Sequence, residues 1–203
     1  MVLLLFGAGC ASLFGPSKPD VSAQMPALES RIYAMIVDER RALDPKARFL
    51  SLDPELVAIA RQRSTDMALK NSIAAEDPHT SANMLMKQDA NFQGLIGENV
   101  AAQHFTPGAG IDVEAVAKNF VDRWLASAPH KENLGFAEYE RTGVGASANG
   151  DTIYVTQLFT TSLGMGPHDA SAPPSQAEPV ASPRKGKDDI ENVPLRGNIA
   201  PGG

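Results

Sequence analysis

Cysteine, cationic residues and long apolar runs are all scarce in this chain of 203 residues. Its one cysteine, Cys10, cannot form an internal disulfide bond, which excludes the small secreted scaffolds that depend on several disulfides. The 18 lysines and arginines are outnumbered by 24 acidic residues, and the net charge is −6. A nucleic-acid-binding protein is therefore not expected, because such proteins need clustered cations to displace counterions. No stretch approaches the roughly 18 consecutive apolar residues of a membrane-spanning helix.

The cysteine lies in an N-terminal segment with the order of a secretory signal. An apolar run, Val2 to Phe6, is followed by Gly-Ala-Gly and then by Cys10. Small residues directly before a cysteine resemble the lipobox of bacterial lipoproteins. We therefore expect residues 1–10 to be a signal segment, with Cys10 as a lipid anchor on a membrane surface, and residues 11–26 to be a linker. The alternative is an uncleaved apolar N-terminus with an incidental cysteine.

The C-terminal part has a different composition from the rest. Residues 166–203 hold seven of the fifteen prolines and no phenylalanine, tryptophan or tyrosine. Such a segment cannot bury enough apolar surface to offset its chain entropy. We therefore predict a disordered, proline-rich tail over residues 166–203.

Residues 27–165 carry the patterns of one α+β domain. Apolar residues at helical spacing predict four helices. These run over 27–43, from Pro54 to about Asn71 with Asp53 as N-cap, from Ser81 to about Asp89, and from Asp112 along an apolar stripe that includes Trp124. We expect Trp124 to be a core residue.

The last third of this region changes to the period of a β-strand. Residues 142–148 and 152–159 flank Asn149-Gly150-Asp151, and Asn-Gly is a strong signal for a hairpin turn. A third strand is predicted from Glu98 to about His104. The fold class that follows is α+β, with helices around a small, mainly antiparallel sheet.

Three polar residues lie at the ends of predicted elements, where rigid scaffolds often present functional groups. They are His79, Glu98 and His130. His104 is a fourth candidate, because on a strand it would share a face with Glu98. Taken singly, such a residue is more often a capping or turn group than a site residue.

The motifs around these residues, taken in order, resemble the CAP superfamily of cysteine-rich secretory, antigen 5 and pathogenesis-related proteins, and especially its bacterial SCP-like branch. The resemblance runs from about Ala27 to Leu163 and implies an α-β-α sandwich with a cleft that holds two histidines and up to two acidic residues. The matching motifs are Asp38-Glu39-Arg40, Leu52-Asp53-Pro54-Glu55-Leu56, Asp66-Met67-Ala68, His79-Thr80, Gly97-Glu98-Asn99-Val100, the run from Trp124 to Leu134, Gly143-Val144-Gly145, and the run from Tyr154 to Phe159.

Transferred residue by residue, the resemblance implies that His79, Glu98 and His130 line the cleft. The position of the family's second acidic residue is Ser127 in this chain, so one negative charge is missing and any cation in the cleft should be held more weakly. His104 has no counterpart among the family's site residues.

Three kinds of chemistry remain open for this residue set. His79, His130 and Glu98 suit a Zn²⁺ ion with an open water position, although the residues lack the His-Glu-x-x-His spacing of a metalloprotease helix. Alternatively, Glu98 orients an imidazole that acts as a general base, with Ser81 or Ser127 as the local hydroxyl. In the third interpretation these groups only hydrogen-bond across the cleft and hold loops together.

We therefore expect a cell-envelope CAP-domain protein that acts as a non-enzymatic binding module, with a divalent metal or a lipid, cell-wall or protein ligand at its cleft. The alternatives are a metal-assisted hydrolase of envelope peptides or lipids, and a purely structural lipoprotein without a cleft ligand. Ala11 rather than Asp follows Cys10, which favours an outer-membrane lipoprotein facing the periplasm; secretion is the other extracytoplasmic possibility.

Overall fold

The computed structural model describes residues 20–74, 79–161 and 195–199. In chain order the elements are η1 (Val21–Gln24), α1 (Met25–Leu43), β1 (Ser51–Leu52), α2 (Pro54–Lys70), α3 (Ser81–Gln88), β2 (Gly94–His104), α4 (Val113–Ala126), α5 (Ala128–Gly135), β3 (Arg141–Asn149), β4 (Thr152–Thr160) and β5 (Leu195–Ile199). Among these residues, no helix combines the length and apolar character needed to cross a bilayer. Cys10 and the predicted signal segment lie outside the described residues.

The strands form one sheet in the order β1-β3-β4-β2-β5. The short β1 runs parallel to β3, and all other neighbours are antiparallel. The β3–β4 hairpin turns at Gly150, whose φ of +61° lies in the left-handed region that glycine tolerates. The predicted hairpin and the mainly antiparallel sheet are both confirmed.

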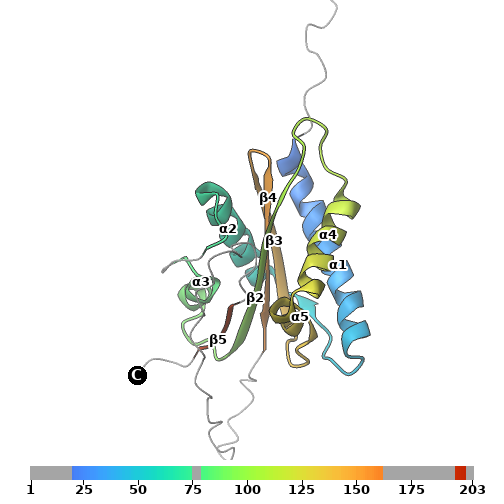
Figure 1. Cartoon of the computed structure of the whole chain (residues 1–203). Helices are drawn as coiled ribbons and strands as arrows, with labels where there is room; N and C mark the ends of the chain where they lie inside the picture. The colour runs from blue at the N-terminus through green and yellow to red at the C-terminus, as the bar shows by residue number, and fades with distance from the viewer. Residues whose placement is uncertain (1–19, 75–78, 162–194, 200–203) are drawn as a thin grey trace, which may run out of the picture.

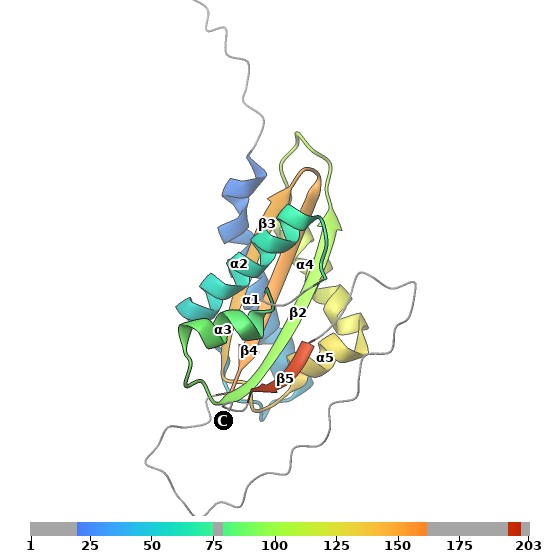
Figure 2. The ribbon, with the colours of Figure 1, turned by 90° about the vertical axis from the view of Figure 1, so that its left-hand side faces the viewer.

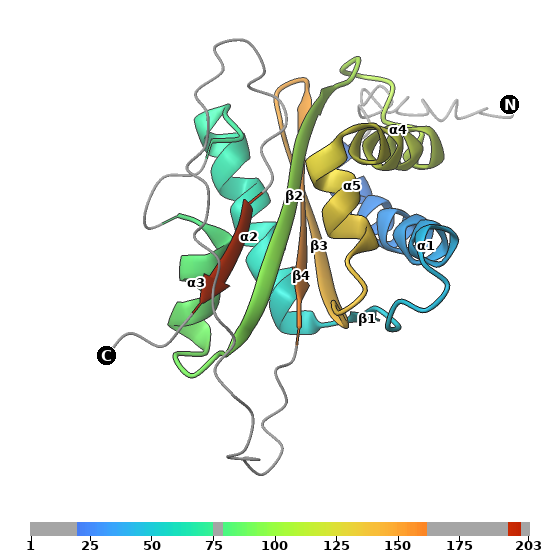
Figure 3. The ribbon, with the colours of Figure 1, turned by 60° about the horizontal axis from the view of Figure 1, so that its bottom comes forward.

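Helices cover both faces of this sheet, and the predicted α-β-α sandwich is confirmed. Helices α2 and α3 lie on one face, and α1, α4 and α5 lie on the other (Figure 1, Figure 3). Every residue of β4 is buried, because this central strand is covered on both sides. Trp124 of α4 is fully buried, as predicted for a core residue.

The helix boundaries follow the predicted caps. The Asp53 carboxylate accepts hydrogen bonds from the backbone N–H groups of Glu55 and Leu56, and Asn71 ends α2 in the left-handed conformation. The Asp112 carboxylate caps the N-terminus of α4 by accepting a hydrogen bond from the Ala115 backbone N–H. Helix α5 was not predicted; Pro129 lies in its first turn, where a missing backbone N–H costs nothing.

Two glycines of β3 bring α2 into direct backbone contact with the sheet. A Cβ atom on Gly143 would lie 2.2 Å from the backbone of Leu56, and one on Gly145 would lie 2.1 Å from the backbone nitrogen of Arg61. Any side chain here would push α2 away from the sheet. The close approach determines how far the side chains of α2 reach across the sheet.

Both predicted flanking segments contain a regular element. Residues 21–26 were assigned to the linker, but η1 and the first turn of α1 occupy them. Within the tail predicted over residues 166–203, Leu195–Ile199 form β5, which pairs with β2 over Gly94–Glu98 (Figure 2). A composition argument misses this strand because its partners are backbone groups on the open edge of β2. The rest of the tail lies outside the described residues.

Candidate functional site

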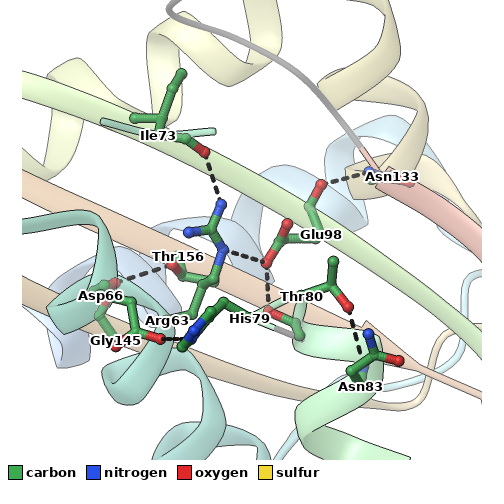
Figure 4. A network of polar contacts seen from close by, with 12 residues as sticks. Arg63, Asp66, Ile73, His79, Thr80, Asn83, Glu98, Asn133, Gly145 and Thr156 are labelled. Carbon is green, nitrogen blue, oxygen red and sulfur yellow. Dashed lines mark hydrogen bonds and ion pairs between the residues drawn. The ribbon is translucent and has the colours of Figure 1, made fainter. Parts of the chain in front are cut away.

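Glu98 is the centre of a buried polar network between β2 and the helices α2 and α3 (Figure 4). Its side chain is almost completely buried. The Ser81 hydroxyl donates a hydrogen bond to Glu98 Oε1. The Nε atom of Arg63 lies 3.6 Å from the same oxygen, which is an ion-pair distance and too long for a hydrogen bond. The second oxygen, Oε2, has no hydrogen-bond partner among the residues that the structure describes.

The pKa of Glu98 is raised above its ordinary value. Burial is the largest cause, because it removes water from the charged form; the positive charge of Arg63 and the Ser81 hydrogen bond act in the opposite direction. Burial outweighs both, so this carboxyl keeps its proton to a higher pH than an exposed glutamate does.

Arg63 is the part of the network that the sequence analysis missed. It lies on the buried side of α2 and is 2% exposed. Its Nη2 donates a hydrogen bond to the carbonyl oxygen of Ile73 at 2.7 Å. One feature of the sequence could have indicated its burial. Arg63 is seven residues after Leu56 and four before Met67, and it therefore lies on the same face of the helix as the apolar stripe of α2.

His79 lies beside this network but makes a different contact. Its Nδ1 is 3.1 Å from Asp66 Oδ2, and the imidazole is about half exposed. Asp66, on α2, was quoted only as part of a motif and not predicted as a site residue. Thr80 follows as the N-cap of α3 and accepts a hydrogen bond from the Asn83 backbone. This cap places Ser81 in the first turn of α3, where its hydroxyl reaches Glu98.

His130 lies in α5 and is completely buried. Neither ring nitrogen has a hydrogen-bond partner among the described residues. Burial, and to a smaller extent the positive charge of Arg123, lower the pKa of His130 to about 4. The imidazole is therefore neutral at physiological pH, with one nitrogen that can donate and one that can accept.

Asparagines join α5 to β2. Asn133 Nδ2 donates to the Glu98 carbonyl oxygen at 3.1 Å and to Asn99 Oδ1 at 3.0 Å, and Asn99 Nδ2 donates to the His130 carbonyl oxygen. Neighbouring strand residues point to opposite faces of a sheet. The Glu98 side chain thus joins α2 and α3, whereas the Asn99 side chain joins α5.

The side chains of the predicted site residues are consequently not joined to one another. Within the described ranges, no hydrogen bond or ion pair joins the side chains of His79, Glu98 and His130 to one another. Ser127 separates α4 from α5, and its side chain makes no capping hydrogen bond. His104 lies at the hairpin end of β2, largely exposed, with its Nδ1 2.8 Å from Thr152 Oγ1 and 3.4 Å from Asp151 Oδ1.

The described residues do not form a zinc site. The part of the chain that the structure describes contains no group of three or more His, Cys, Asp or Glu side chains placed to hold a metal ion. The cation next to Glu98 is instead the guanidinium of Arg63. Zinc binding by His79, Glu98 and His130 stays a prediction from the sequence. A cavity of about 300 Å³ lies elsewhere, between the end of α1 and residues 44–50.

Comparisons with known proteins agree with this fold. The model of the cysteine-rich secretory protein family, CAP, matches residues 36–159. A search of curated proteins finds no match. Among solved structures, an outer surface protein from Borrelia burgdorferi is 21% identical over 72% of this chain and 98% of its own, with a TM-score of 0.53. An extracellular SCP-domain protein from Bacillus anthracis is 26% identical over 73% of this chain and 45% of its own, with a TM-score of 0.54. The chain belongs to the cysteine-rich secretory protein (CAP) family.

Proposed function

We propose that this chain is a non-enzymatic binding module of the cell envelope whose ligand site is centred on Glu98. The observation that carries the proposal is the state of the Glu98 carboxyl. One oxygen is held by Ser81 and Arg63, while the other is buried without a partner in the described part of the chain. A buried polar atom without a partner costs about 1–3 kcal/mol, and a ligand with hydrogen-bonding groups relieves this cost.

The same network argues against a hydrolase. A serine nucleophile needs an adjacent base to take its proton. The Ser81 hydroxyl donates to Glu98, and the His79 imidazole faces Asp66. Among the described residues, neither His79 nor His130 hydrogen-bonds to a hydroxyl. The histidine–hydroxyl pair that the hydrolase alternative requires is therefore not formed among the described residues.

The ligand that suits this site is polar and uncharged. Glu98 and Arg63 already balance each other's charge, so the remaining need is for hydrogen bonds rather than for a counter-ion. Hydroxyl and amide groups supply both donors and acceptors. The glycan strands of the cell wall are rich in both and are the ligand class we assign to the site.

A protein that binds this ligand is expected outside the cytoplasm. The structural relatives are named as an outer surface protein and an extracellular protein. Gly-Ala-Gly before Cys10 supports a lipid anchor, and Ala11 after it supports an outer-membrane protein facing the periplasm. The Cys10→Ser variant should move from the membrane fraction to the soluble fraction of the native host. The control variant, Ser12→Ala, should stay in the membrane fraction. Retention of the Cys10→Ser variant in the membrane would refute the anchor.

The ligand proposal is tested by co-sedimentation of the full chain with purified peptidoglycan sacculi. The wild type should sediment with the sacculi, and Glu98→Gln should weaken binding by about tenfold or more, since a hydrogen bond to a charged group is worth about 1.5–3 kcal/mol. Glu55→Gln is the matched control, because Glu55 is exposed at the start of α2. Equal binding by wild type and Glu98→Gln contradicts the site. Soluble fragments released by the wild type and not by Glu98→Gln contradict the non-enzymatic assignment.

A further inference from the structure

Arg63 is a buried cation that local helix packing does not require. It occupies a position of α2 where the repeat of Leu56, Ala60 and Met67 calls for an apolar side chain. A charged residue is almost never fully buried unless it is paired. The partners of Arg63 are the Glu98 carboxylate, 3.6 Å from Nε, and the Ile73 carbonyl oxygen, 2.7 Å from Nη2. The guanidinium is therefore held in place from two sides.

This guanidinium already occupies the side of the carboxylate next to Oε1. Oε1 of Glu98 already faces both Arg63 and Ser81. A divalent ion beside it would lie against a fixed positive charge in a poorly hydrated interior, where like charges repel far more strongly than in water. The charges also balance as they stand, with one carboxylate for one guanidinium.

The neighbouring acidic groups do not supply further negative charge to Glu98. Asp66 is engaged with His79. The position at which the family resemblance implies a second acidic residue is Ser127 in this chain. A doubly charged ion would therefore leave the site with excess positive charge.

We infer that Arg63 is the resident cation of the Glu98 site, and that its guanidinium holds the carboxylate in place without a divalent metal ion. Arg63 is thus a positioning residue: it orients Glu98, whose second oxygen has no hydrogen-bond partner among the described residues. The inference concerns the same site as the proposed function but does not depend on the ligand being cell wall. Either can fail without the other.

The first arm of the test measures metal dependence on the intact chain. The melting temperature of the full chain is measured after EDTA treatment and after addition of ZnCl₂, in the wild type and in Glu98→Gln. Subtracting the Glu98→Gln result removes zinc effects at surface pairs such as His79–Asp66 and His104–Asp151. We expect no zinc-dependent shift that requires Glu98. A zinc-dependent rise in the wild type that Glu98→Gln abolishes overturns the inference.

The second arm tests whether the positive charge of Arg63, rather than the volume of its side chain, stabilises the fold next to Glu98. Arg63→Ala should lower the melting temperature, and millimolar methylguanidinium should restore part of the loss. N-methylurea is the uncharged control of similar shape and should not restore it. The rescue should disappear in the Arg63→Ala/Glu98→Gln double variant. Equal rescue by N-methylurea, no rescue by methylguanidinium, or rescue that persists in the double variant overturns the inference. If Arg63→Ala does not fold, the zinc arm on the wild type decides the question alone.

Discussion

Acidification should destabilise the fold through one buried side chain, His130. Its pKa is lowered to about 4 by burial, whereas an unfolded chain restores the ordinary value near 6.5. Between these two pKa values the unfolded state binds more protons than the folded state, so the free energy of unfolding falls as pH falls. The contribution is fully present above about pH 6.5 and is lost progressively toward pH 4. Lowering the pH from 7 to 5 should remove about 2 kcal/mol of stability through this group.

Trp124 makes the measurement direct. It is the only tryptophan in the chain and is fully buried, so its fluorescence reports unfolding in urea. The free energy of unfolding is measured between pH 5 and pH 7 for the wild type, for His130→Leu and for His104→Gln. Leucine at position 130 removes the titrating group without leaving a hydrogen bond unmade, because neither ring nitrogen has a partner in the described part of the chain. His104 is largely exposed and serves as the matched histidine control.

The comparison is made on the difference between each variant and the wild type, since carboxyl groups also titrate toward the acid end of this range. The pH-dependent loss should be about 2 kcal/mol smaller in His130→Leu than in the wild type. It should be unchanged in His104→Gln. Parallel curves for the wild type and His130→Leu would show that His130 is protonated in the folded state as easily as in the unfolded state, and would refute the reasoning.

Two further predictions concern the close approach of α2 and the edge of β2. Gly145→Ala should lower the free energy of unfolding, measured in urea, by about 3 kcal/mol or more, because its Cβ would lie 2.1 Å from the backbone of α2. Gly135→Ala is the control, since its Cβ would meet only Leu43 at 3.9 Å. Equal losses in the two variants would contradict the packing argument. Gly197→Pro should speed hydrogen exchange at the Ile96 amide, since Gly197 of β5 pairs with Ile96 of β2 and proline disrupts a strand. Unchanged exchange at Ile96 would show that β5 does not protect this edge.

The features that were predicted correctly depend on residues close together in the chain. Asp53 caps α2 through groups two and three residues away, and Asn149-Gly150 turns the hairpin within a few residues. The stripe that ends at Trp124 repeats within one helix. Local interactions of this kind are encoded in short windows, which is why the helices and the hairpin could be placed before the structure was known.

The features that were missed depend on partners far away in the chain. Strand β5 pairs with the edge of β2, which supplies its backbone partners. This edge lies about a hundred residues earlier in the sequence. The family resemblance named Glu98, His79 and His130 together, but it could not show that no hydrogen bond joins their side chains among the described residues. Arg63 was not considered before, because nothing near it in sequence indicates that Glu98 lies opposite.

The sequence by itself determined the family, the helix caps, the hairpin and the residues worth examining, because each of these is written in a local motif or in the order of motifs. The tertiary structure alone decided which charges meet. Gly143 and Gly145 let the backbone of α2 lie directly on β3. This brings Arg63 within 3.6 Å of Glu98 and leaves His79 with Asp66. Charge pairing at a buried site depends on a few ångströms of helix placement, and that distance is set by packing across the whole sheet.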